Sequence, residues 1–121
     1  MKTHKDLDIW NTGIGLVEEV YCITKAFPSE EQFGITAQMR RAAVSVPANI
    51  AEGAARSSRK EFVKFLYVSL GSLSELETEL IIAEKLNYIR HSAIFGTVED
   101  LRKKMLNFIR YQKSRIPSKG S

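Results

Sequence analysis

Apolar residues recur every three or four positions along most of the chain, which is the spacing of one face of an α-helix. Polar segments containing proline, serine, asparagine or glycine separate four such stretches. The expected helices span residues 7–26, 29–55, 58–86 and 92–112. Because the links between them are short, neighbouring helices should run antiparallel. The pattern predicts an all-α, up-and-down antiparallel four-helix bundle, formed as a single domain by residues 1–115 and followed by a flexible tail at 116–121.

Three of the expected helices carry one clear apolar face that should line the core. In the first helix this face consists of Trp10, Ile14, Val17, Tyr21 and Thr24, and it is widened by Leu16, Val20, Ile23 and Phe27. In the third it consists of Phe62, Leu66, Ser69, Leu73, Leu76, Leu80 and Ala83. In the fourth it consists of Phe95, Val98, Leu101, Met105, Phe108 and Gln112. Polar residues predict the helix starts: Asp6 caps the first helix, and capping boxes at 29–32 and 58–61 open the second and third.

The second expected helix is apolar on two sides. The core side consists of Met39, Ala43, Val46, Ile50 and Gly53. The roughly opposite side, called here the alanine stripe, consists of Ala37, Val44, Ala48, Ala51 and Ala55. A helix that is apolar on two sides should be buried on two sides, which is hard to achieve within one chain of 121 residues. We therefore expect the alanine stripe to contact a second copy, so that the bundle assembles into a cyclic homo-oligomer.

Pro47 lies inside this second stretch and cannot donate a hydrogen bond to the carbonyl of Ala43. One interpretation is a kink in a continuous helix. The other is a break, with Val46 in an extended conformation. The stripes keep their phase on both sides of Pro47, which favours the kink.

A polar stripe lies between the two apolar sides of this helix. We expect it to face two glutamates of the third helix and to form a structural polar seam of Gln38, Arg41, Ser45, Asn49, Glu75 and Glu79. Buried charged groups need such partners, because an unpaired charge in the interior is costly. The seam would fix the register of the two helices.

Several short motifs stand out in the sequence: Phe27–Pro28, Glu-Gln-Phe-Gly at 31–34, Gln38, Arg-Arg-Ala-Ala at 40–43, Ser-Val-Pro at 45–47, Asn-Ile-Ala-Glu-Gly at 49–53 and Gly-Ser-Leu-Ser-Glu-Leu-Glu-Thr at 71–78. Together they resemble one family, the four-helix-bundle proteins first met as reading frames within intervening sequences of bacterial 23S ribosomal RNA genes. The resemblance covers residues 7–111. It implies an up-down bundle, a homopentamer, no enzymatic activity and a proposed nucleic-acid role. A related accessory protein of diversity-generating retroelements is similar in fold and binds a reverse transcriptase and RNA.

The formal net charge is +4, and the excess lies at the end of the chain. Residues 90–121 hold eight basic and two acidic groups, so 8 − 2 gives +6. The candidate phosphate-binding residues there are Lys103, Lys104, Arg110, Lys113 and Arg115. A second basic cluster, for which a solvated rim is the competing interpretation, consists of Arg56, Arg59, Lys60 and Lys64.

No catalytic, cofactor-binding or metal-binding pattern is present in the sequence. His4 and His91 have no carboxylate or cysteine at ligand spacing. Glu75 and Glu79 lie four apart, but a di-metal bundle would also need Glu-x-x-His pairs. The lone Cys22 excludes an intrachain disulfide and fits a reducing cytoplasm. There is no apolar run of about 18 residues, so we expect no membrane-spanning helix.

The sequence therefore favours a non-enzymatic, oligomeric binding protein whose partner is RNA, DNA or a nucleic-acid enzyme such as a reverse transcriptase. The second hypothesis is a protein–protein scaffold or accessory subunit, whose basic surface meets an acidic protein. An enzyme with a site between subunits is the weakest of the three.

Overall fold

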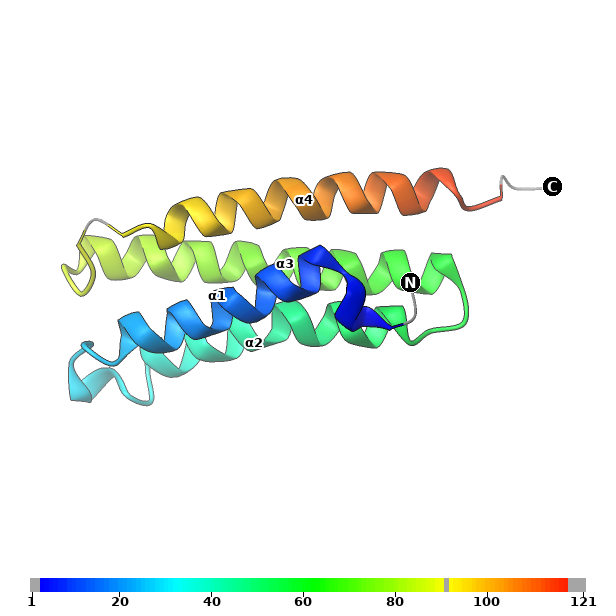
Figure 1. The fold of residues 1–121 in the computed structure, drawn as a ribbon. Coiled ribbons are helices and arrows are strands. Elements are labelled where there is room, and N and C mark those ends of the chain that lie inside the picture. Colours follow the sequence, from blue (N-terminus) through cyan, green and yellow to red (C-terminus); the bar gives the residue numbers. More distant parts are fainter. Residues whose placement is uncertain (1–2, 91, 118–121) are drawn as a thin grey trace.

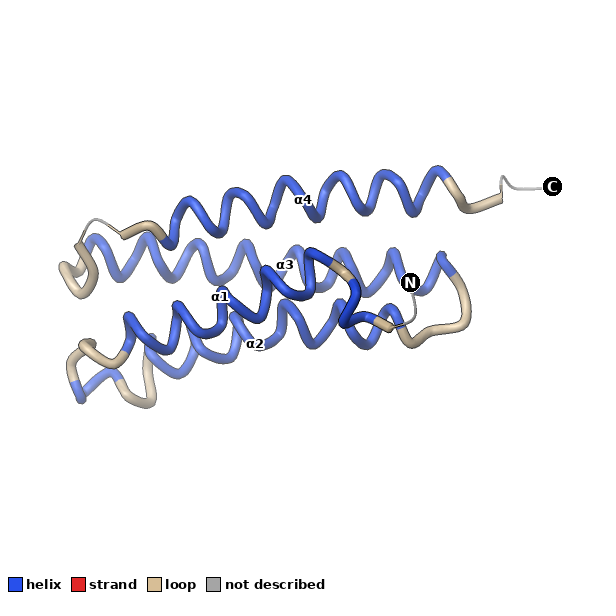
Figure 2. The backbone as a smooth tube through the Cα atoms, viewed as in Figure 1, coloured by secondary structure: helices blue, strands red, loops and turns tan. Residues whose placement is uncertain are grey.

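The structure is a computed structural model that describes residues 3–90 and 92–117, and this part of the chain contains four α-helices and no strand. The helices are α1 (Asp8–Thr24), α2 (Ile35–Ala54), α3 (Arg59–Lys85) and α4 (Ile94–Ser114), with 3-10 helices η1 (His4–Asp6) and η2 (Ser29–Glu31) before α1 and α2. Successive helices run in opposite directions, so η1, the α2–α3 turn and the end of α4 share one end of the bundle (Figure 1). The all-α prediction is confirmed (Figure 2).

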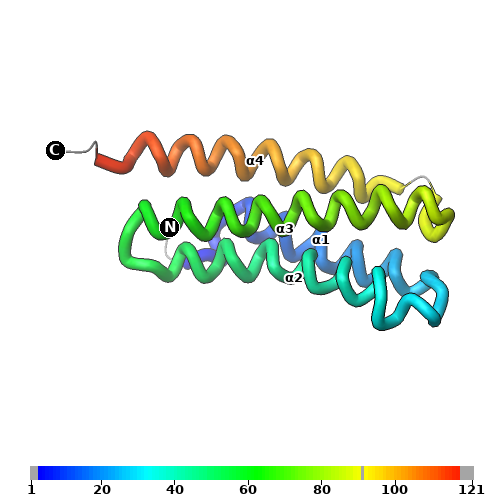
Figure 3. The backbone as a smooth tube through the Cα atoms, turned by 180° about the vertical axis from the view of Figure 1, so that it is seen from behind, coloured from blue at the N-terminus to red at the C-terminus, as the bar shows by residue number. Residues whose placement is uncertain are grey.

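Each helix packs on two neighbours, in the pairs α1–α2, α2–α3, α3–α4 and α4–α1, and no diagonal pair comes close in the described residues. The α2–α3 interface is the most extensive, and Figure 3 shows α3 lying along α2 for most of its length. The largest side chains that are fully buried between the helices are Leu16, Met39, Ile50, Leu66, Leu73, Leu76, Leu80, Ile94, Leu101 and Met105.

Small residues allow α2 and α3 to approach closely. A Cβ atom at Gly53 would lie 2.7 Å from Cβ of Phe65 and 3.0 Å from Cδ1 of Phe62, so no larger residue fits without a shift. Ser69, buried on α3, donates a hydrogen bond of 2.7 Å to the carbonyl oxygen of Val46. These contacts fix the two longest runs of core residues against each other.

Helix α2 continues through Pro47, which is buried, so the alternative of a break at this position is wrong. The proline faces α1 at a glycine: a Cβ atom on Gly13 would lie 3.4 Å from Cβ of Pro47, in close van der Waals contact. The small residue therefore leaves room for the proline ring between α1 and α2.

The second helix begins later than the sequence predicted. Gly34 is the N-cap of α2, and residues 29–31 form η2, whose N-cap Pro28 makes no side-chain cap bond. The predicted capping box at 29–32 is therefore wrong. The Glu31 carboxylate instead accepts a hydrogen bond of 2.8 Å from the Tyr88 hydroxyl, which ties this loop to the α3–α4 turn. The predicted cap of α1 is wrong as well: the Asp6 carboxylate accepts a hydrogen bond from the backbone amide of Thr3 at the start of η1, and Leu7 is the N-cap of α1.

Helix α3 begins and ends with well-formed caps. The Ser58 hydroxyl accepts a hydrogen bond of 3.1 Å from the amide of Glu61, as the sequence predicted for a start at this position. At the other end, Asn87 has a φ of 63°. The amide of Asn87 donates to the carbonyl of Glu84, and the amide of Tyr88 to that of Ala83. This is a Schellman motif, which satisfies the last carbonyls of the helix.

The predicted core face is right for α3 and only partly right for α1, where the widening residues Leu16 and Val20 are buried with Thr24. All seven predicted core residues of α3 are buried. On α1 the buried residues are Ile9, Gly13, Leu16, Val20 and Thr24, whereas Ile14 and Tyr21 are 37% and 40% exposed. Apolar side chains surround much of α1, so periodicity alone left its orientation open. On α4, Phe95 and Phe108 are half-buried, and Ile94 and Ile109 join the core.

The expected tail at 116–121 lies mostly outside the described residues, which end at 117. Ile116 is half-buried and packs against the hydrophobic core. The chain therefore still contacts the core just beyond the end of α4.

Candidate functional site

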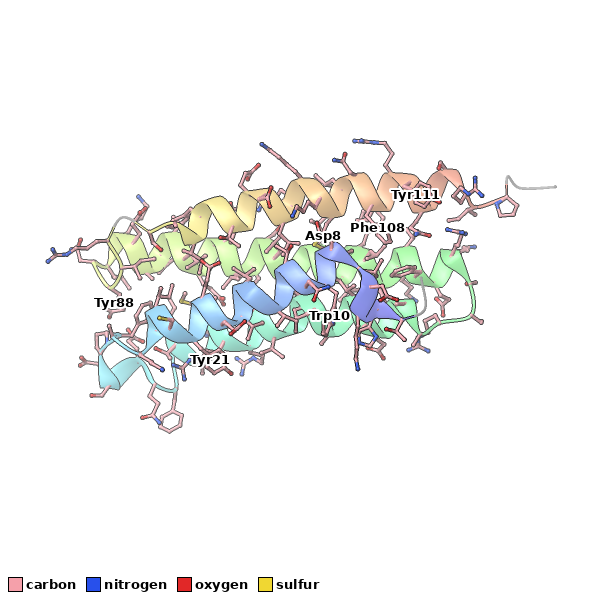
Figure 4. All side chains as sticks on the ribbon, in the orientation of Figure 1. Asp8, Trp10, Tyr21, Tyr88, Phe108 and Tyr111 are labelled. Atoms are coloured by element: carbon pink, nitrogen blue, oxygen red, sulfur yellow. The ribbon has the colours of Figure 1, made fainter. Side chains whose placement is uncertain are left out.

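Helix α4 presents a basic outer side. Lys103, Arg110 and Lys113 are exposed, as is Arg115 just beyond the helix. Val98 and Leu101 lie on the opposite side, in the core. Figure 4 shows nitrogen-tipped side chains projecting away from the bundle along this helix.

Lys104 differs from the other candidates on α4, because its ammonium group is already paired within the chain. Its Nζ lies 3.0 Å from a carboxylate oxygen of Asp8 and 3.3 Å from one of Asp100. Hydrogen bonds to these two carboxylates raise the pKa of Lys104. The side chain therefore links α4 to the start of α1 and is less available for a phosphate.

A similar arrangement neutralises the other acid of α4. Arg102 lies 2.6 Å from Glu77 on α3 and 2.6 Å from Glu99 on its own helix. The hydrogen bond to Glu77 is the main reason that the pKa of Arg102 is raised. Arg102 was not a candidate residue in the sequence, and its role here is to join α3 and α4. The outer side of α4 beyond these pairs is left with basic groups alone.

The basic cluster at the α2–α3 turn meets the end of α4. Arg56, Arg59, Lys60 and Lys64 are all exposed. The guanidinium group of Arg59 donates a hydrogen bond of 2.6 Å to the side-chain oxygen of Gln112, a residue 53 positions away in the sequence. The α2–α3 cluster thus forms a junction with the last turns of α4, which carry Arg110 and Lys113, whereas Lys103 and Lys104 lie near the middle of that helix.

A cavity of about 500 Å³ lies at this junction. It is lined by Leu7, Arg56, Ser57, Ser58, Arg59, Phe62, Phe108, Tyr111 and Gln112. The guanidinium group of Arg56 already has partners within the chain, because it forms an ion pair of 3.2 Å with Glu52 and lies over the ring of Phe65. Figure 4 places Phe108 and Tyr111 on the end of α4 beside the α2–α3 turn. The cavity combines arginine and serine side chains with aromatic rings.

A second hollow, the α3–α4 groove, lies on the other flank of α4. It has a volume of about 230 Å³ and is lined by Tyr67, Leu106, Ile109, Arg110 and Lys113. The Lys113 ammonium donates a hydrogen bond of 3.4 Å to the Tyr67 hydroxyl. Tyr67 was not predicted as a site residue, because in the sequence it lies within the apolar pattern of the third helix.

The expected polar seam is present only in its uncharged part. Ser45 and Ser72 share a hydrogen bond of 2.8 Å between their hydroxyl groups, and Asn49 donates to both the carbonyl and the hydroxyl of Ser45 at 2.9 Å. Gln38 is exposed. Arg41 is exposed too, and in the described residues no ion pair joins it to either glutamate of α3. The predicted ion pair is therefore absent from the described residues, although the charge of Arg41 still lowers the pKa of Glu79.

Glu79 is the most unusual charged residue of the bundle. Its side chain is 6% exposed, and its Oε1 atom has no hydrogen-bond partner among the described residues. Burial and, to a smaller extent, the nearby Glu75 carboxylate raise the pKa of Glu79 to about 7, while Arg41 acts in the opposite direction. A proton shared between Glu75 and Glu79 would relieve both the burial of charge and the repulsion.

The alanine stripe remains on the surface of the single chain. Ala48 and Ala55 are exposed, Val44 is 43% exposed, and Ala37 and Ala51 are half-buried. The loop residue Phe33 is 90% exposed beside it. A hollow of about 500 Å³ connects the two and is lined by Tyr21, Gln32, Phe33, Thr36, Ala37, Arg40, Arg41 and Val44. The bundle thus leaves this apolar side of α2 uncovered.

The described residues were also compared with the requirements of a metal site and of a membrane-spanning helix. Within residues 3–90 and 92–117, no group of three or more His, Cys, Asp or Glu side chains could hold a metal ion. No helix in that part of the chain is long and apolar enough to cross a membrane. The ring of His4 lies edge-on to Trp10, and His91 falls outside the described residues.

Comparisons with known proteins agree on the family and the fold. The family model of the 23S rRNA-intervening sequence proteins matches residues 5–109. Among solved structures, the chain is similar to a protein of unknown function from the S23 ribosomal protein family of Bacteroides thetaiotaomicron. The two share 22% identity and a TM-score of 0.78, over 84% of this chain and 98% of that one, which establishes a common fold. Curated proteins yield no match.

The raised pKa of Glu79 predicts a stability that depends on pH. The folded chain binds the Glu79 proton more tightly than the unfolded chain, so stability falls as pH rises from about 4.5 to about 7. One pKa unit corresponds to about 1.4 kcal/mol, so thermal melting followed by circular dichroism should detect the loss. Glu79→Gln should remove this dependence and should melt at a higher temperature than the parent above about pH 7.

Two glutamate variants of the same helix serve as controls. Glu75→Gln removes the neighbouring negative charge and should weaken the dependence without abolishing it. Glu84→Gln changes an exposed position and should keep the dependence of the parent. If Glu79→Gln and the parent lose stability equally over this range, Glu79 is not the titrating group.

Proposed function

We propose a function for this chain, which belongs to the 23S rRNA-intervening sequence protein family. The proposed function is that of a non-enzymatic, oligomeric protein that binds nucleic acid through basic surfaces. The observation that carries the proposal is the junction between the basic α2–α3 turn and the last turns of α4, where Arg59 bonds to Gln112 close to the exposed Arg110 and Lys113 in the sequence. Nucleic-acid phosphates are contacted mainly by arginine and lysine side chains, hydroxyl groups and backbone amides. The junction offers such groups around one cavity.

The charges available to a phosphate support the same proposal. Glu99 and Asp100, the two acids of α4, are paired with Arg102 and Lys104. Lys103, Arg110 and Lys113 are not paired with carboxylates in the described residues, so their charges face solvent uncompensated. No helix or strand of a known base-reading motif is present in the sequence, so binding should depend on charge and shape with little sequence preference.

Self-association would repeat this surface. Exposed apolar area on the scale of the alanine stripe and Phe33 is uncommon on a monomer. A contact between the stripe and a different face of a second copy would form a closed ring, and the family resemblance suggests five copies. In a ring, each chain needs only a few phosphate contacts for appreciable total affinity.

Removing three exposed cations of α4 should weaken nucleic-acid binding. In Lys103→Gln/Arg110→Gln/Lys113→Gln, the slope of log affinity against log salt should fall by about 0.7–0.9 for each phosphate that the protein no longer neutralises. Filter binding with a structured RNA and a DNA duplex, over a salt series, measures this slope. The fold should survive because all three positions are exposed.

A matched control removes the same charge at the other end of the bundle. Lys25, Lys85 and Arg90 are exposed near the α1–α2 loop and the α3–α4 turn. Changing these three to glutamine should leave the slope close to that of the parent. An equal fall of the slope in both triple variants would mean that net charge alone attracts the polyanion. If the parent binds neither RNA nor DNA at low salt, an acidic protein partner becomes the better hypothesis.

A charge placed in the alanine stripe should release monomers. Ala48→Glu would place a carboxylate in the contact between copies, where its burial without a partner is costly. Multi-angle light scattering at micromolar concentration should report an oligomer for the parent and a monomer for this variant. Ala93→Glu, at an exposed position before α4, should leave the assembly unchanged. A monomeric parent would contradict the proposal, whereas a ring of another size would correct only the number five.

A further inference from the structure

The α3–α4 groove contains an aromatic ring between basic side chains. Tyr67 of α3 is 47% exposed. Its hydroxyl accepts from the Lys113 ammonium at 3.4 Å, while the ammonium lies 5.7 Å from the centre of the ring. The cation thus lies toward the hydroxyl edge of the ring. About half of the tyrosine surface remains open to a ligand.

The remaining walls of the groove are apolar. Leu106 is 41% exposed, and Ile109, at 2% exposure, is buried beneath it. The volume of about 230 Å³ is smaller than the roughly 300–1,000 Å³ of pockets that enclose a whole small molecule. The groove therefore suits one planar, partly apolar group of a larger ligand.

The charges at the groove select an anionic ligand. Arg110 donates to the neutral side chain of Asn107 at 3.0 Å, and Lys113 donates to Tyr67. No carboxylate lines the groove. Lys64 is exposed one helical turn before Tyr67 and adds a third positive charge from α3. A planar group that enters here would have its attached anionic chain beside at least two cations.

We propose that the α3–α4 groove holds one unpaired base of a single-stranded nucleic acid, stacked on Tyr67 and Leu106, with Arg110 and Lys113 on the flanking phosphates. This inference rests on the function proposed above and narrows it to single strands. Stacking of a base on an aromatic side chain tolerates any sequence, because every base has a π-face. In a duplex these faces are covered by neighbouring base pairs, so only the phosphate contacts remain.

The test compares a short, unstructured, single-stranded oligonucleotide with the duplex of the same sequence, by fluorescence anisotropy at fixed salt. Tyr67→Ala should weaken binding of the single strand by about fivefold or more, since one stacked base is worth about 1–3 kcal/mol. Binding of the duplex should stay within about twofold, because the phosphate-binding cations are unchanged. Tyr67→Phe keeps the ring and should bind the single strand like the parent.

Tyr111→Ala tests the competing aromatic site. Tyr111 is 53% exposed on α4 and lines the cavity at the α2–α3 turn instead of the groove. Because that cavity belongs to the proposed binding surface, this variant should affect single strand and duplex alike, whereas Tyr67→Ala should weaken binding of the single strand alone. Melting curves and light scattering verify that all variants keep the fold and assembly of the parent.

The outcomes separate this inference from the function on which it rests. Suppose that the parent binds both single strand and duplex. If Tyr67→Ala then binds both like the parent, or loses affinity for both equally, the base-stacking groove is wrong and the general function stands. If only Tyr111→Ala loses single-strand affinity, the base stacks at the other cavity and the groove is again wrong. If the parent binds neither oligonucleotide at low salt, both the inference and the proposed function fail.

Discussion

Helix α2 is apolar on two opposite sides, and a four-helix monomer has one core to cover them. Its inner side, with Met39, Val46 and Ile50, is fully buried. Close packing on α3 depends on the missing side chain of Gly53, because a Cβ atom there would lie 2.7 Å from Phe65. The outer side stays exposed around Val44. Both the architecture of the bundle and its proposed self-association follow from this two-sided helix.

The four helices were predictable because each long helix has a periodic core face, as α3 shows with all seven predicted residues buried. The phase of α1 was not predictable in the same way. Ile14 and Tyr21 fit the helical period as well as Leu16 and Val20 do, and only packing against α2 and α4 decides between them. The start of α2 was also missed. Glu31 is hydrogen-bonded to Tyr88, and a contact with a residue so distant in the sequence is not visible in the local pattern.

The basic positions of the candidate site were visible in the sequence, but their pairing was not. Lys104 is paired with Asp8, and Tyr67 meets Lys113, contacts that depend on how the helices align along their axes. A single sequence does not give that alignment. The helical period shows only which residues of the same helix are neighbours, those three or four positions apart. For the same reason the sequence suggested an ion pair for Arg41 where the structure has a buried, proton-binding Glu79.

We propose that nucleic acid meets the protein on the flank of α4 beside α3. Photochemical cross-linking of the unmodified protein to a single-stranded oligonucleotide that carries a photoreactive base tests this claim most directly. Mass spectrometry should locate the cross-links at Tyr67, Leu106, Arg110 or Lys113, which line the α3–α4 groove. Cross-links confined to the alanine stripe or to the α1–α2 loop at the far end of the bundle would contradict the account.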